Sequence, residues 1–314
     1  MATVRCSAPT TDRARHARCT RLRALAVTAV LAAPFVVGAV AQARPSPASR
    51  EATVAFRITD REITESSGLV VLPVDGEELA VTVNDSGDSG RVFTIDPATG
   101  DTVGVTSFSP EPRDVEALAP AGDGHVWVAD IGDNLKARDS IRVTRVPVGR
   151  GNRDAGQAES YELTHPDGPR DAEALVVHPT TGRLHVITKQ VLGGTVHRAP
   201  EELDPDAPNA LEKVGEAPSL VTDAAFAPSG DLVVMRSYGH AWVKTFPELD
   251  KVADFALPAQ PQGEGLAIDG AGQVLLSTEG LERPVLIAPL PVGLRGELAG
   301  ASFFWRTFYR HLDG

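Results

Sequence analysis

Two similar heptapeptides, "RDVEALA" at residues 113–119 and "RDAEALV" at residues 170–176, decide the fold. Looser copies read "ESSGLVV" at 65–71, "VTDAAFA" at 221–227 and "QGEGLAI" at 262–268. The polar residues that align in the five copies are Ser67, Glu116, Glu173, Asp223 and Glu264. Their intervals of about 40 to 57 residues indicate a repeat architecture built from one supersecondary unit.

Each copy opens a unit of short β-rich segments separated by turn residues. In the second unit these segments are "ALAPA", "HVWVAD", "IRVTRV" and "SYELTH", and no stretch after residue 43 has a clear helical period. Four-stranded units of this length are typical of propeller blades. We therefore predict an all-β fold, a single β-propeller of five four-stranded blades.

The fifth unit lacks a fourth strand of its own. The segment "ATVAFRIT" at 52–59 is predicted to supply it, which would close the ring and leave no long open edge. The alternative is a six-bladed ring with a degenerate blade in the long interval between Glu116 and Glu173. Residues 299–314 fit neither count, although the propeller domain is taken as 52–314.

The N-terminus has the pattern of a secretory signal. A basic segment precedes the apolar run "ALAVTAVLAAPFVVGAVA" and the small-residue site "AQA" at 41–43. This order predicts a signal peptide over residues 1–43, a short linker at 44–51 and a secreted, extracellular protein. The alternative is an uncleaved membrane anchor; after cleavage no membrane contact is expected.

Composition excludes several kinds of site. Both cysteines, Cys6 and Cys19, fall within residues 1–43, so disulfides, cysteine-ligated zinc and a thiol nucleophile are excluded from the rest of the chain. Beyond residue 43 there are 24 basic and 41 acidic residues, a net charge of −17. That charge argues against nucleic acid as a partner.

The repeats place two polar sets at one mouth of the central channel, because an inner strand starts where its antiparallel neighbour ends. The first set is the five aligned residues. The second comprises Asn84, Asp85, Asp130, Lys189, Arg236 and Glu279. Crowded carboxylates repel one another, so either a bound cation or the two basic residues must offset their charge.

An oxygen-only ligand set favours a hard cation, Ca²⁺ before Mg²⁺. The candidate metal ligands are Glu116, Glu173, Asp223, Glu264, Asn84 and Asp130. The candidate catalytic residues are Glu173, Lys189, Arg236 and His240. Lys189 and Arg236 would hold an anionic group, and His240 would act as general base. The alternative is a structural ion-pair network that plugs the channel.

The tetrapeptide "GDSG" at 87–90 matches the surroundings of a serine-protease nucleophile. However, "NDSGDSG" aligns with "ADIGDNL" of the second unit, which places Asn134 opposite Ser89. Asp, Asn, Ser and Gly favour tight turns. The match therefore indicates a repeated turn rather than a catalytic serine.

Several motifs together resemble a family of secreted bacterial propellers, known as WD40-like or phytase esterase-like proteins. They are "NDSGDSGRVFTID", "RDVEALA", "VWVADIGDN", "HPDGPRDAEALVV" and "ITK". The resemblance implies a secreted β-propeller and an esterase-like enzyme. It also implies axial calcium held by inward acidic and amide groups, here Glu116, Glu173, Asp223, Glu264 and Asn84. Lys189 and Arg236 depart from that pattern.

Two functions follow as hypotheses. The first is a monomeric, metal-dependent hydrolase of small-molecule esters or phosphoesters. The second is a non-enzymatic propeller that binds a cell-envelope partner, since one fold hosts both classes.

Overall fold

The computed structural model describes residues 52–300. The predicted signal peptide and linker, and residues 301–314, lie outside this range. Within it, no helix has the length and apolar character needed to cross a membrane.

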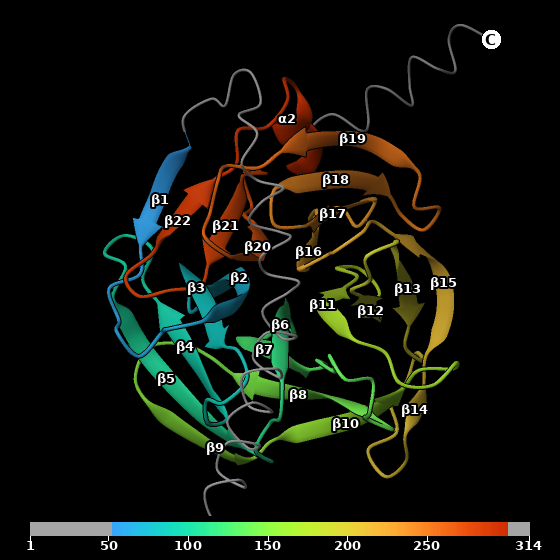
Figure 1. Ribbon diagram of the computed structural model, residues 1–314. Helices are drawn as coiled ribbons and strands as arrows, with labels where there is room; N and C mark the ends of the chain where they lie inside the picture. The colour runs from blue at the N-terminus through green and yellow to red at the C-terminus, as the bar shows by residue number, and fades with distance from the viewer. Residues whose placement is uncertain (1–51, 301–314) are drawn as a thin grey trace, which may run out of the picture. The chain divides into compact units, whose positions relative to one another are not determined.

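Five β-sheets form a ring around a central axis, as predicted (Figure 1). Blade 1 contains β2 (Ser66–Val74), β3 (Glu77–Asn84), β4 (Arg91–Ile95) and β5 (Thr102–Ser109). Blade 2 contains β6 (Val115–Pro120), β7 (His125–Asp130), β8 (Ile141–Pro147) and β10 (Glu159–Thr164). Blade 3 contains β11 (Ala172–Val177), β12 (Leu184–Thr188), β13 (Gly194–Arg198) and β15 (Glu212–Ala217).

Blade 4 contains β16 (Asp223–Phe226), β17 (Leu232–Arg236), β18 (His240–Thr245) and β19 (Lys251–Ala256). Blade 5 contains β20 (Gly263–Ile268), β21 (Val274–Thr278), β22 (Pro284–Ile287) and the N-terminal β1 (Thr53–Arg57). Strand β1 pairs antiparallel with β22, so the predicted closure by both ends of the chain is confirmed. A short helix, α2 (Leu294–Leu298), follows β22.

The six-bladed alternative is wrong, because the long interval between Glu116 and Glu173 contains the strands of blade 2 and no additional blade. Its extra residues include β9 (Arg153–Gln157), which runs parallel to β5 and extends blade 1. Similarly, β14 (Asn209–Ala210) extends blade 2 beside β10. These two strands lie at the outer edges of blades 1 and 2, and the number of blades remains five.

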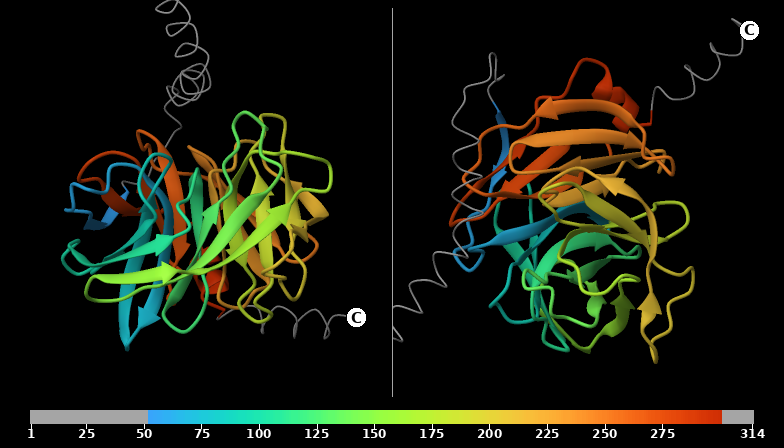
Figure 2. Two further views of the ribbon diagram at one scale, coloured as in Figure 1. Left: turned by 90° about the horizontal axis from the view of Figure 1, so that it is seen from below. Right: turned by 45° about the vertical axis from the view of Figure 1, so that its right-hand side comes forward.

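The inner strands β2, β6, β11, β16 and β20 surround the axis and run in the same direction. We call the face where they start the near face; it points toward the viewer in Figure 1. We call the opposite face, where the turns between first and second strands lie, the far face. Figure 2 shows the strands running between these faces, with loops projecting from both.

The seam that closes the ring is apolar. Phe56 of β1 is buried with Ile63, Phe93 and Val285, which join blades 1 and 5. On the same strand, the side chain of Val54 points outward and is 49% exposed. This contrast allows the contribution of the closing strand to be measured.

Phe56→Ala is expected to lower the free energy of unfolding by about 3 kcal/mol, because it opens a cavity in this seam. Val54→Ala is expected to change it by less than about 0.5 kcal/mol, as is usual for an exposed position. Urea denaturation of both variants checks the prediction. Equal effects would show that β1 does not seal the ring through Phe56.

Candidate functional site

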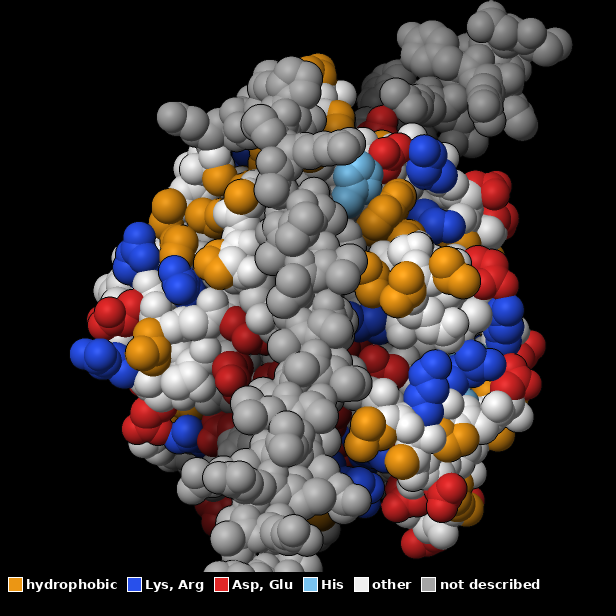
Figure 3. All heavy atoms as spheres, in the orientation of Figure 1, with side chains coloured by type: hydrophobic (Ala, Val, Ile, Leu, Met, Phe, Trp, Pro, Cys, Tyr) orange, Lys and Arg blue, Asp and Glu red, His pale blue; other side chains and the backbone are white. Residues whose placement is uncertain are grey.

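The structure brings both polar sets together on the near face. Each inner strand pairs there with the end of the second strand: Ser66 with Asn84, Val115 with Asp130, Ala172 with Thr188, Asp223 with Arg236, and Gly263 with Thr278. In Figure 3, Asp and Glu side chains lie recessed toward the centre of this face. The mouth therefore concentrates carboxylates, as the repeats predict.

Four inner strands carry a register irregularity at the aligned polar residue. In β6 the pairing skips Glu116, and in β11 it skips Glu173; β2 and β20 shift at the same point. A bulge of this kind re-aims a side chain and is common beside functional sites. Strand β16 pairs without a shift, so Asp223 has a regular strand position.

Glu116 lies in a cluster with Asp85 and Asp114, in which one carboxylate oxygen of each residue lies within 4.8 Å of the other two. Glu116 is 5% exposed, and its carboxylate accepts no hydrogen bond from the described residues. The backbone passes beside it at Gly132, where a Cβ would collide with the carboxylates of both Asp114 and Glu116. We call Asp85, Asp114 and Glu116 the near-face carboxylate cluster.

Asp114 is fixed by its backbone rather than by its side chain. Its N–H donates to Asp130 Oδ1 (3.0 Å), and its carbonyl accepts from the Gly132 N–H (3.1 Å). Asp130 Oδ1 also accepts from Arg138 Nη1 at 2.7 Å. Asp130 therefore positions the loop that carries Asp114 and is itself held in a buried ion pair.

Lys189 forms the central ion pair of the mouth. Its Nζ donates to Glu173 Oε1 at 2.8 Å and lies 5.3 Å from the ring centroid of Tyr238. Burial opposes the charge of Lys189, but Glu173 and Glu264 outweigh it and hold its pKa well above the usual value. Lys189 is therefore a fixed cation beside the carboxylates.

Arg236 and Asp223 connect blades 4 and 5. The fully buried guanidinium of Arg236 donates to the carbonyl oxygens of Gly265 (2.9 Å) and Ser277 (3.3 Å) and to Gln260 Oε1 (3.0 Å). Asp223 accepts from the N–H groups of Ala224 (2.8 Å) and Leu266 (2.6 Å). Both side chains are thereby engaged in structural bonds.

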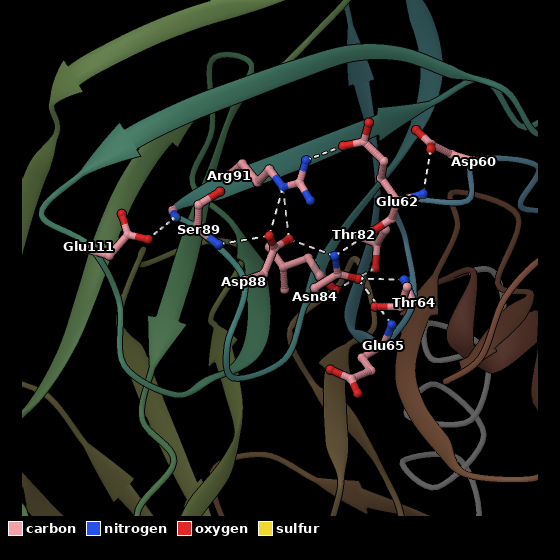
Figure 4. A network of polar contacts seen from close by, with 12 residues as sticks. Asp60, Glu62, Thr64, Glu65, Thr82, Asn84, Asp88, Ser89, Arg91 and Glu111 are labelled. Atoms are coloured by element: carbon pink, nitrogen blue, oxygen red, sulfur yellow. Dashed lines mark hydrogen bonds and ion pairs between the residues drawn. The ribbon is translucent and has the colours of Figure 1, made fainter.

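Asn84 belongs to a separate network at the edge of the mouth (Figure 4). Its Oδ1 accepts from the N–H groups of Thr64 and Glu65, while Nδ2 donates to the Glu62 carbonyl and to Asp88. The amide has no bonding capacity left for a metal.

The "GDSG" segment forms a turn next to this network. Asp88 accepts from the Ser89 N–H (2.8 Å) and pairs with Arg91 (2.9 Å). These contacts agree with the interpretation of the segment as a repeated turn.

His240 lies on the outer side of blade 4. Its Nε2 is 3.0 Å from Asp254 Oδ2 of the outermost strand, and its ring packs on Trp242. This histidine is therefore bonded to the outermost strand of blade 4 rather than to a carboxylate of the mouth.

Burial and mutual repulsion raise the pKa values of the mouth carboxylates. Burial, then Glu173, Asp85 and Asp114, hold the pKa of Glu116 well above its usual value. Burial raises the pKa of Glu173 to about 8 and that of Glu264 to about 7. Burial, together with Asp85 and Asp171, raises the pKa of Asp114 to about 6.

Three residues of this mouth were not predicted as site residues from the sequence: Asp114, Asp171 and Tyr238. The first two precede Glu116 and Glu173 by two positions in the repeated "RDxEAL" segment. That Asp-x-Glu spacing was the signal that could have found them. Tyr238 lies in the blade 4 loop, where no other blade has an aromatic residue at the matching position, so no repeat pointed to it.

The near-face carboxylate cluster fits a divalent cation. Three carboxylates within 4.8 Å can share an ion with oxygen distances of about 2.3–2.6 Å, which is the range of Ca²⁺. The bare carboxylate of Glu116 and the space kept open by Gly132 suit such an ion. Glu173 is bound to Lys189 instead.

Without a metal, the protein is expected to lose stability as the pH rises from about 4.5 to about 8. Glu116, Glu173 and Glu264 have raised folded-state pKa values, so the folded chain binds more protons than the unfolded chain in this window. The contribution of these three groups to the stability of the folded state is complete below their unfolded-state pKa. It is lost as the pH rises through each folded-state pKa. Melting temperatures in chelator at pH 5 and pH 8 measure the effect; equal values would contradict it.

Comparisons with known proteins identify no family for this chain. No family model matches the sequence, and no curated protein matches it either. Among solved structures, a glutaminyl cyclase from Myxococcus xanthus is similar at 12% identity and a TM-score of 0.47, covering 75% of this chain and 95% of that chain. A candidate 6-phosphogluconolactonase from Bacteroides uniformis is similar at 14% identity and a TM-score of 0.40, covering 71% and 68%. Neither likeness is strong enough to support an argument about this chain, whose five-bladed fold is established by its own strand pairing.

Proposed function

We propose that the protein is a Ca²⁺-dependent hydrolase of uncharged carboxylic esters, acting at the near-face mouth. The observation that carries the proposal is the near-face carboxylate cluster, in which Glu116 is buried and lacks a hydrogen-bond partner among the described residues. Repulsion among such groups is relieved most directly by a divalent cation. The ligands we propose are Asp85, Asp114 and Glu116.

A bound Ca²⁺ would supply Lewis-acid polarisation of an ester carbonyl. The chain's own groups supply the rest of the chemistry. Lys189, held at 2.8 Å by Glu173, is a fixed positive charge that can stabilise negative charge developing on oxygen. Glu264 accepts no hydrogen bond from the described residues, and its pKa of about 7 suits a group that takes a proton from water.

The charges of the mouth favour an uncharged substrate over a phosphoester. Arg236 is fully buried and bonded to backbone oxygens, and Lys189 is already paired with Glu173. A positive charge shared in this way can stabilise the partial negative charge that develops on an ester oxygen, but among several carboxylates it does not favour a phosphate dianion. Of the two substrate classes that the sequence left open, esters and phosphoesters, we therefore propose uncharged carboxylic esters.

The rim of the mouth favours an apolar substituent on the ester. Four of the large, exposed hydrophobic side chains of the described region lie in near-face loops, next to site residues: Leu135, Val191, Leu192 and Leu281. Val191 and Leu192 follow Lys189, and Leu281 follows Glu279. An acyl chain entering the mouth would cover this exposed apolar surface.

Assays with p-nitrophenyl acetate, butyrate and phosphate test the proposal. Hydrolysis of the two carboxylic esters is expected with Ca²⁺, faster for butyrate, and is expected to stop with chelator. Glu264→Gln should lower kcat about 100-fold and remove the rise of kcat/KM through pH of about 7, which requires the deprotonated base. Glu202→Gln, at an exposed glutamate, is the matched control.

Two outcomes would contradict the proposal. Hydrolysis that persists in chelator rules out the metal requirement, and preferential hydrolysis of the phosphate rules out the substrate class. A protein that binds Ca²⁺ but hydrolyses none of the esters is instead a metal-stabilised binding propeller.

A further inference from the structure

A large apolar cavity opens on the far face, opposite the carboxylates. It has a volume of about 560 Å³ and is lined by all five inner strands. Its wall includes Leu118, Trp127, Leu175, Val177, Phe226 and Ile268, and none of its lining residues is Asp, Glu, Lys or Arg. The cavity is therefore lined mainly by apolar groups, which an apolar segment could bury.

The described chain ends on this same face. Helix α2 packs against the far-face turn of blade 5, where Arg295 Nε donates to the Ala271 carbonyl at 3.2 Å. The end of the helix lies against Gly272, where a Cβ would meet the Ala299 backbone nitrogen at 2.6 Å. Ile268, in the wall of the cavity, is four residues from Gly272. The described chain therefore ends on the face that carries the apolar opening.

The sequence of the 14 residues after Gly300, "ASFFWRTFYRHLDG", suits that opening. It contains five aromatic residues, against ten phenylalanines, three tryptophans and three tyrosines in the whole chain. Large apolar side chains recur at helical spacing, at Phe304, Phe308 and Leu312 and at the neighbouring Trp305 and Tyr309. A stripe of this composition is costly to leave in water.

Charge adds a second complementarity. The far-face turns around the cavity carry exposed carboxylates that form no ion pair among the described residues: Asp75, Glu78, Asp123 and Asp231. Between its apolar residues, the terminal segment carries Arg306 and Arg310. Arginines flanking an aromatic stripe would therefore face an acidic rim when the stripe enters the cavity.

We propose that residues 301–314 dock onto the far face of their own chain, with the aromatic stripe in the apolar cavity and Arg306 and Arg310 against the acidic turns. The reach is sufficient, since 14 residues span about 20 Å as a helix and up to about 45 Å when extended. The proposed occupant of the cavity is thus a segment of this chain.

Trp305 provides a direct test in the full chain, because the protein has three tryptophans. In the Trp127→Phe, Trp242→Phe variant, Trp305 is the sole tryptophan. Its emission is expected to be blue-shifted, and its quenching by acrylamide several-fold weaker in the folded protein than in urea. Equal quenching in the two states would overturn the proposal, whether or not any further variant folds.

A substitution in the wall of the cavity tests whether Trp305 is shielded from acrylamide at that site. Adding Phe226→Ser is expected to restore quenching of Trp305, whereas the control Leu192→Ser, at a near-face side chain that is 98% exposed, leaves it unchanged. Shielding that survives Phe226→Ser in the folded protein means that the segment docks elsewhere and overturns the proposal. Shielding that increases with protein concentration means that the segment enters a second copy, which also overturns docking within one chain.

Discussion

Calcium is expected to raise the melting temperature of the wild-type protein by about 5–10 °C, and Glu116→Gln is expected to abolish that rise. An ion that binds only the folded state at 100 times its dissociation constant stabilises it by about 2.7 kcal/mol. For a chain of this size, each kcal/mol corresponds to about 2–4 °C. Thermal melts at pH 8 with Ca²⁺ and with chelator measure the difference.

The same substitution is expected to act in the opposite direction when the metal is removed. Glu116 is buried beside Asp85 and Asp114, and neutralising it relieves repulsion that no ion then offsets. In chelator at pH 8, Glu116→Gln should therefore melt higher than the wild type. A variant that melts lower in both conditions would identify Glu116 as a structural residue and refute the metal site; Glu202→Gln serves as the exposed control.

Arg236→Met is expected to cost about 3–5 kcal/mol of stability, the largest effect of any single change we predict. The guanidinium has no exposure and makes hydrogen bonds to Gly265, Ser277 and Gln260. It also favours the charged form of Glu264. Removing it leaves buried acceptors without donors and a buried carboxylate without its cation.

Urea denaturation of Arg236→Met at pH 7 measures this cost. The matched control is Arg198→Ala, which breaks a half-exposed ion pair with Glu212 at 2.6 Å and should cost less than about 1 kcal/mol. Similar midpoints for the two variants would show that Arg236 is dispensable to the ring.

The architecture was predictable because each blade repeats one pattern. The five copies of the inner strand fixed the number of blades, and "ATVAFRIT" was recognisable as the missing strand by its alternation. The outer strand β15 has no clear alternation, since half of its residues are charged and exposed. Strands β9 and β14 are short additions whose partners are distant in sequence.

The site was predictable as a face of the ring but less so residue by residue. A repeat places Asn84, Glu116, Asp223 and Arg236 near the mouth, but it does not reveal which hydrogen bonds each side chain makes. The amide of Asn84 is consumed by the backbone of residues 62–65, whereas Glu116 is left bare by a bulge. Such differences depend on loops between the repeats, where the five copies share little sequence.

The pairing of β1 with β22 also governs how the chain reaches its native state. Thr53 lies in the first strand of the described region to be synthesised, yet its partner Ile287 is among the last strand residues of that region to appear. The ring therefore cannot close until nearly the whole chain is available, and contacts of such long sequence separation make folding slow. Until that pairing forms, the chain remains an open ring, and it stays open for longer than a chain whose blades are each completed by neighbouring residues.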